Sequence, residues 1–237
     1  MRTLLLAFLL CLGPSLLAQH LTFQEWSAKS VRDMRLIPRF GDRHKSPAQK
    51  ESDAEFIRMS LEQIPDRRKA SEAMVAHGFE LLKQGNLTHA MYRFNHAFLL
   101  DSTNSDVYWG YGSFFMELDQ PSAAHTLFRA GLSTDTTNAH LFTGEATAYL
   151  AEHYALEKQD PAAAKEVVTK AMAMLVRAER HAPKDPAVLY RLAVCHLLQG
   201  NCTKARKYYT ACKDLPNAPV EAGFEQRLAA ACPAKGE

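Results

Sequence analysis

The feature that most constrains the fold is an internal repeat of 34 residues, which occupies positions 71–138. Its two copies, 71–104 and 105–138, carry similar residues at corresponding positions. The matched pairs are Gly78 with Gly112, Ala90 with Ala124, Phe94 with Phe128, Ala97 with Gly131, Asp101 with Asp135 and Asn104 with Asn138. Small residues let two helices cross closely, and a large ring then fills the space beside the crossing. Because one such unit cannot bury its apolar face alone, the repeat predicts a stack of helix pairs.

This period resembles the tetratricopeptide repeat, a helix–turn–helix unit. The resemblance covers residues 71–219 and implies an all-α, right-handed solenoid of about four helix pairs. The expected units are 71–104, 105–138, 139–185 and 186–219 of a solenoid over 66–219. The third unit contains an insertion, which we interpret as lengthened helices over 139–157 and 161–181 rather than as a protruding loop, because both segments are strong helix formers. In that unit Glu145 occupies a position where the repeat normally has an apolar residue.

The first 18 residues have the pattern of a secretory signal peptide. Arg2 is followed by the apolar stretch Leu4–Leu12, and Ala18 offers a small residue before a cleavage point. The stretch is shorter than the ~20 residues that span a bilayer. Cys11 raises a lipoprotein alternative, but the residues before it are not the small ones that a lipoprotein cleavage site has. We therefore expect an exported protein of the bacterial type, periplasmic or secreted.

The remaining segments flank the solenoid. Residues 19–45 show no clean period, and Pro38 and Gly41 interrupt any helix, so we expect an irregular arm that lies on the repeats. A basic surface for an acidic partner or for lipid headgroups is the alternative for this arm. Ser46 and Pro47 begin a helix that ends at Pro65, and we expect this segment, 46–65, to cap the first repeat. A capping helix over about 220–232 and a short tail end the chain, within 220–237.

Little in the sequence indicates catalysis, metal binding or nucleic-acid binding. The formal net charge is only +2, so no strongly basic field exists to attract nucleic acid. Ten histidines are present, but neither they nor the cysteines have the spacing of a metal site, and no motif of a hydrolase or nucleotide-binding enzyme occurs. We expect no catalytic residue, no metal and no cofactor, hence a protein that is not an enzyme.

Four cysteines lie in the last repeat and the segment after it. In stacked antiparallel helices, the start of one helix lies near the end of the following helix. This places Cys202 near Cys232, and we predict a disulfide between them. Cys195 and Cys212 occupy inward positions for small residues and are expected to be packed thiols.

The resemblance also implies where a partner would bind, because the first helices of the units line a concave groove in this repeat family. The groove residues that we expect to contact a protein or peptide partner are Phe79, Trp109, Met116, Tyr190 and Arg191. Family members that clamp terminal carboxylates carry Lys, Arg and Asn at several groove positions. This chain has Val75, Phe79, Gly110, His140 and Gly144 there, so that clamp is absent.

We therefore expect a protein–protein interaction module that binds a partner segment in the groove. The alternative is a structural subunit or assembly factor of a cell-envelope complex. A further possibility is that the N-terminal arm or the last helix fills the groove.

Overall fold

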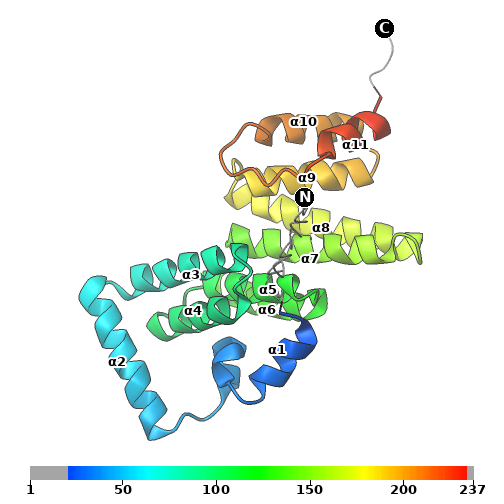
Figure 1. The fold of residues 1–237 in the computed structure, drawn as a ribbon. Helices are drawn as coiled ribbons and strands as arrows, with labels where there is room; N and C mark the ends of the chain where they lie inside the picture. Colours follow the sequence, from blue (N-terminus) through cyan, green and yellow to red (C-terminus); the bar gives the residue numbers. More distant parts are fainter. Residues whose placement is uncertain (1–20, 234–237) are drawn as a thin grey trace, which may run out of the picture.

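Residues 21–233 are the part of the chain that the computed structural model describes, and they form eleven α-helices with two short 3-10 helices and no strand (Figure 1). The predicted signal peptide, 1–18, lies outside the described residues. Four antiparallel helix pairs make up the body of the molecule: α3 (Arg67–Lys83) with α4 (Leu87–Leu100), α5 (Asp106–Glu117) with α6 (Pro121–Thr134), α7 (Ala139–Leu156) with α8 (Pro161–His181), and α9 (Pro186–Leu198) with α10 (Cys202–Cys212). The pairs follow one another in a single stack. The predicted all-α solenoid is therefore confirmed.

In each of the first two units, a phenylalanine ring packs directly against the backbone of a glycine. In the first unit, a Cβ atom added to Gly78 would lie 2.4 Å from Phe94 Cε1, and one added to Gly110 would lie 2.4 Å from Phe94 Cδ1. Gly78 belongs to the first unit and Gly110 to the second. The Phe94 ring is thus held between two successive units, at a spacing that side chains on either glycine would prevent.

The same arrangement recurs one period later. A Cβ atom on Gly112 would lie 2.2 Å from Phe128 Cε1, and one on Gly144 would lie 2.6 Å from the same atom. Both rings are buried. The sequence predicts a ring beside each helix crossing, and in the structure the ring lies directly over each glycine.

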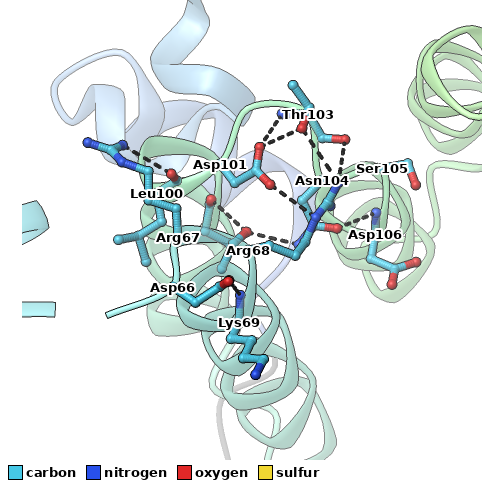
Figure 2. Close-up of polar contacts among 12 residues, drawn as sticks. Asp66, Arg67, Arg68, Lys69, Leu100, Asp101, Thr103, Asn104, Ser105 and Asp106 are labelled. Atoms are coloured by element: carbon cyan, nitrogen blue, oxygen red, sulfur yellow. Dashed lines mark hydrogen bonds and ion pairs between the residues drawn. The ribbon is translucent and has the colours of Figure 1, made fainter. Parts of the chain in front are cut away.

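The turns between units repeat the same hydrogen bonds. In the turn shown in Figure 2, Asp101 Oδ1 accepts from the backbone nitrogen of Thr103 at 2.9 Å and from its hydroxyl at 2.6 Å. Asn104 Nδ2 donates to Ser71 Oγ at 2.9 Å, and Arg68 pairs with Asp101 at 3.0 Å. The next turn has the equivalent bonds from Thr137 to Asp135 (2.9 Å) and from Asn138 to Ser105 (2.8 Å). The matched Asp and Asn residues of the repeat therefore tie each turn to the first helix of its own unit.

The third unit has long helices, with 18 residues in α7 and 21 in α8, and this hairpin extends past its neighbours in Figure 1. Helix α7 is buried on both sides. Leu141 and Ala148 belong to a core with the first two units, whereas Phe142, Ala146 and Leu150 belong to a second core with α8 to α11. The insertion thus lengthens the one helix that both cores share.

A charged cluster replaces apolar packing between α6 and α7. Glu145 is only 2% exposed, and its Oε1 accepts from Arg129 Nε at 2.8 Å. Its Oε2 lies 2.9 Å from His125 Nδ1, and Glu152 Oε1 lies 3.4 Å from the other nitrogen of that imidazole. Arg129 also donates to the Tyr149 hydroxyl at 2.9 Å. Glu145 occupies an apolar position of the repeat because α6 places the Arg129 guanidinium and the His125 imidazole beside its carboxylate.

The N-terminal arm is more ordered than we expected. It contains α1 (Phe23–Ser30), begun by a capping box between Thr22 and Glu25, and the 3-10 helices η1 (Met34–Leu36) and η2 (Pro38–Asp42). An 8-residue helix is too short to show a period, so the expectation of an irregular segment over 19–45 missed α1. The capping box was the available signal.

Hydrogen bonds hold this arm on α4 and α5. Trp26 Nε1 donates to the Leu36 carbonyl at 2.9 Å, and the indole packs edge-on against the ring of Phe115. Asn95 of α4 donates to the carbonyls of Arg35 and Ile37, at 2.7 and 2.9 Å. The arm is therefore part of the folded body.

Helix α2 (Pro47–Gln63) covers the first repeat only in part. It starts at Ser46, which forms a capping box with Gln49, and in Figure 1 it stands apart from the stack. None of its residues is buried. Its contact with α4 includes Phe56, whose ring stacks on His96 at 4.1 Å between centroids. The expected cap over 46–65 is thus a helix that contacts α3 and α4 and covers only part of the first unit.

The last helix, α11 (Phe224–Ala231), is shorter than the expected 220–232. It begins after Gly223, whose φ of +79° breaks the helical path. Residues 213–223, between α10 and α11, form a linker of turns and irregular backbone. A disulfide joins Cys202 at the start of α10 to Cys232 at the end of α11. Cys195 and Cys212 are buried free thiols, and burial raises the pKa of the Cys195 thiol to about 12.

We expect Gly112→Leu to destabilise the fold by ~1–3 kcal/mol or more, because its side chain would overlap the Phe128 ring. Ala76→Leu, at an exposed site on α3, is the control and should change the unfolding free energy little. Urea denaturation followed by circular dichroism measures both. Equal stability of the Gly112 variant and the parent would contradict the shared-ring packing.

We expect Glu145→Ala to lower the unfolding free energy by at least ~2 kcal/mol, because it removes the buried carboxylate that accepts from Arg129 Nε and lies 2.9 Å from His125 Nδ1. The control is Glu166→Ala on α8, where an exposed pair with Lys170 is lost and the change should stay within ~0.5 kcal/mol. The same denaturation assay compares them. Equal effects of the two substitutions would show that the buried cluster adds nothing.

Peptide mapping of native protein without reductant should recover the peptides of Cys202 and Cys232 as one cross-linked species. Cys195 and Cys212 should react with a thiol reagent only after denaturation, because both are buried. Closing a loop of this size is expected to add roughly 3–4 kcal/mol of stability, measured by comparing oxidised and reduced protein. Recovery of Cys202 as a free thiol would refute the pairing.

Candidate functional site

A row of aromatic rings crosses the first helices of three successive units. The Phe79 ring of α3 lies 3.9 Å from the Trp109 ring of α5, and the Trp109 ring lies 4.2 Å from the His140 imidazole of α7, measured between centroids. His140 is fixed by Asp106, whose Oδ1 lies 3.1 Å from Nδ1, and this contact raises the pKa of the imidazole. One residue from each unit thus contributes to a continuous aromatic surface.

The row leads into a first hollow of about 220 Å³ between α5, α7 and α9. We refer to it as the central hollow. Its lining combines an indole, a thioether, hydroxyls, an imidazole, two carboxylates and one guanidinium: Trp109, Ser113, Met116, Glu117, His140, Thr147, Asp185 and Arg191. Such a mixture of apolar walls and a few polar groups is typical of a site that binds an extended chain.

A second hollow, also about 220 Å³, follows at the fourth unit and is called the end hollow here. Its walls are largely apolar and come from the long helix α7, from α9 and from the linker before α11: Leu150, Ala151, Tyr154, Val194 and Pro219. Tyr154 is 49% exposed and lies on the part of α7 that the insertion adds. Thr147 and Arg191 line both hollows and form the boundary between them.

The linker closes the far end of this groove. The backbone nitrogen of Glu221 donates to the Tyr190 hydroxyl at 3.2 Å, and the Phe224 ring packs against the Tyr190 ring at 5.1 Å. As a result Tyr190 is only 3% exposed. The C-terminal residues therefore cover Tyr190 and border the end hollow without filling it. No described residue of the N-terminal arm lines either hollow.

Arg191 is a cation of the groove that forms no ion pair within residues 21–233. Its Nε donates to Thr147 Oγ1 at 2.6 Å, and a terminal nitrogen donates to the Ala187 carbonyl at 3.2 Å. The nearby carboxylates have other partners, because Asp185 caps α9 and Glu221 pairs with Arg227 at 2.8 Å. Burial lowers the pKa of the guanidinium, which nevertheless remains charged.

The structure thus brings four of the five expected contact residues together. Trp109, Met116 and Arg191 line the central hollow, and Phe79 stacks beside them. Tyr190 is the exception. It was expected to be accessible because its position faces the groove in a regular unit, but the linker and Phe224 cover it.

Two features of the site escaped sequence reasoning. Tyr154 lies on the inserted turns of α7, outside the 34-residue register, so no repeat position pointed to it. The linker was predicted to be part of a helix over 220–232, although Gly223 was a signal for a break. Regarding chemistry, no group of three or more metal-ligating side chains occurs in the described chain.

Comparison with known proteins adds little. No family model matches the chain, and no curated protein matches it. A similar solved structure comes from work described as "Functional Characterization of Pseudomonas Aeruginosa pilF", with 19% sequence identity, a TM-score of 0.36, and coverage of 69% of this chain and 85% of that chain. A likeness at this level transfers neither a partner nor an activity. Within residues 21–233, no helix is long and apolar enough to cross a membrane.

Proposed function

We propose that the chain is a non-enzymatic binding module that holds an apolar segment of a partner protein in its groove. The observation that carries the proposal is the aromatic row of Phe79, Trp109 and His140, which leads directly into the central hollow. Large aromatic side chains and arginine contribute most of the energy at protein interfaces. The site offers such groups on rigid helices.

The partner class follows from the lining of the groove. Trp109 and Met116 offer apolar surface, and Ser113 offers a hydroxyl for the backbone of a bound segment. The formal net charge of +2 gives no reason to favour nucleic acid. A nucleophile, a base and a stabilising group that converge on one point are the requirement for an enzyme, and no such set motivates that interpretation.

We further propose an exported location, periplasmic or secreted. The disulfide between Cys202 and Cys232 supports it, because disulfides persist in oxidising compartments. A structural subunit or assembly factor of a cell-envelope complex is the alternative role. Purification separates the two: a binding module is recovered as a stable monomer, whereas a fixed subunit is recovered only with its complex.

Trp109→Ala is the direct test of the groove. A partner is first identified by pull-down from the native cell envelope and mass spectrometry, and its purified form is then titrated calorimetrically. We expect the substitution to weaken binding by ~2 kcal/mol or more, about 30-fold, because it removes the centre of the aromatic row. Helicity by circular dichroism should not change.

Phe23→Ala on α1 is the matched control, since it removes an exposed aromatic ring outside the groove. Its affinity for the same partner should equal that of the parent. If the Trp109 variant also binds like the parent, the partner uses another surface and the groove proposal is wrong.

A further inference from the structure

The charges of the solenoid are unevenly distributed between its first and second helices. Among Asp, Glu, Lys and Arg, the first helices α5 and α7 contain acids only. The second helix of the last unit, α10, has the opposite composition, because it carries Lys204, Arg206 and Lys207 and no acid. Helix α8 also carries more cations than acids. The small net charge of the chain therefore conceals a basic surface over α8 and α10.

This basic surface contains a hollow of about 390 Å³, which we call the outer hollow. Its apolar walls come from the turn after α8, from α9, from α10 and from the linker: Pro183, Leu189, Ala211 and Leu215. Leu215 is 37% exposed, so the hollow is open to solvent. No residue that lines the central or the end hollow also lines this one.

We propose that the outer hollow is a second binding surface, which takes an acidic segment of a partner protein. One apolar side chain of that segment enters the hollow. Asp or Glu residues on either side of it lie on the ammonium groups of Lys184, Lys204 and Lys207. The inference goes beyond the proposed function, because it concerns a surface that is separate from the groove.

The first support is the charge of the rim. Lys184 and Lys207 line the outer hollow, and Lys204 lies one turn before Lys207 on the same face of α10. All three lysines are exposed, and none of them forms an ion pair among residues 21–233. Like charges at this spacing on a helix repel each other. Carboxylates of a partner would relieve that repulsion.

The acids of this region leave the rim positive. Glu166 pairs with Lys170 at 2.7 Å, and Asp214 lies 3.9 Å from Lys213. Asp185, which follows Lys184 in the chain, lines the central hollow instead.

The one carboxylate in the outer hollow belongs to Glu179. The Tyr208 hydroxyl donates to its two oxygens, at 3.0 and 3.3 Å. A carboxylate accepts more hydrogen bonds than one hydroxyl supplies, so Glu179 can still accept from an N–H group of a ligand.

The second support decides between a polypeptide and other polyanions. A polypeptide brings backbone N–H donors for Glu179 as well as acidic side chains for the lysines. The phosphates of a nucleic acid or of a lipid headgroup bring negative charge without such donors. The apolar part is also recessed, since Leu189 is only 7% exposed. A single side chain can enter such a recess, whereas the flat surface of a bilayer cannot.

A library of displayed random decapeptides tests the inference without knowledge of the partner. Constant sequence flanks each peptide at both ends, so that chain ends play no part. The full chain selects binders, and a Lys184→Glu, Lys207→Glu double variant is used to remove peptides that bind elsewhere. We expect the remaining peptides to be enriched in Asp and Glu around one apolar residue. Selected peptides are then synthesised and titrated by fluorescence anisotropy.

Single substitutions locate the effect. We expect Lys207→Glu to weaken binding at least about 10-fold, and the loss should shrink as salt is raised. Lys158→Glu, in the exposed turn between α7 and α8, makes the same change of charge away from the hollow and should bind like the parent. Ala211→Phe fills the hollow from an exposed position and should abolish the preference for the apolar residue over serine. Trp109→Ala should bind like the parent.

The outcomes separate this surface from the groove. If the parent and the double variant select the same peptides, or if Lys158→Glu and Lys207→Glu weaken binding equally, the outer hollow is not the site. Loss of binding by Trp109→Ala would place the peptides in the groove and would also refute the assignment. Vesicles with anionic phospholipid and a DNA duplex serve as competing probes. If either binds more tightly than the peptides and depends on Lys207, the class of partner is wrong. None of these results bears on the groove test with Trp109 and its own partner.

Discussion

The solenoid depends on one recurring contact, a phenylalanine ring held between two glycines of successive units. Phe94 and Phe128 each belong to one unit and meet backbone in the next one as well as in their own. Because these contacts allow no side chain on the glycines, they set how closely neighbouring helices approach. Repeat proteins obtain much of their stability from such interfaces between neighbours. The Asp and Asn side chains of the turns fix the shape of each turn and tie it to the first helix of its own unit.

The candidate site follows from this register. When units repeat at a fixed spacing, residues at related positions of the first helices come to lie side by side, and the rings of Phe79, Trp109 and His140 stack in this way. The regular part of the chain thus produces an aromatic row. The irregular parts, which are the long α7 and the linker before α11, produce the end of the groove, where Arg191 has only neutral hydrogen-bond partners among the described residues.

The difference between these parts explains what could be predicted. Helix boundaries in the repeats follow from period, caps and glycine turns, and α8 has the limits 161–181 that the sequence indicates. Where the chain departs from the 34-residue period, its structure is harder to predict from the sequence. The capping box of α1 spans too few residues for a pattern, and the burial of Tyr190 depends on a linker whose path is decided by tertiary contacts. The pairing of Glu145 with His125 was hidden because the two residues lie in different units, and only the anomaly of a charged residue at an apolar position was visible.

Helix α7 belongs to both hydrophobic cores, and this has a mechanical consequence. A solenoid flexes when one stack of helices rotates slightly against the next, and here the two stacks share α7 as their common element. His140 and Thr147, which line the central hollow, lie on that helix, while Trp109 lies in one core and Arg191 beside the other. A segment bound across them would bridge the joint of the superhelix. A bound segment would then stiffen the whole solenoid, so that its flexibility would differ between the occupied and the empty groove.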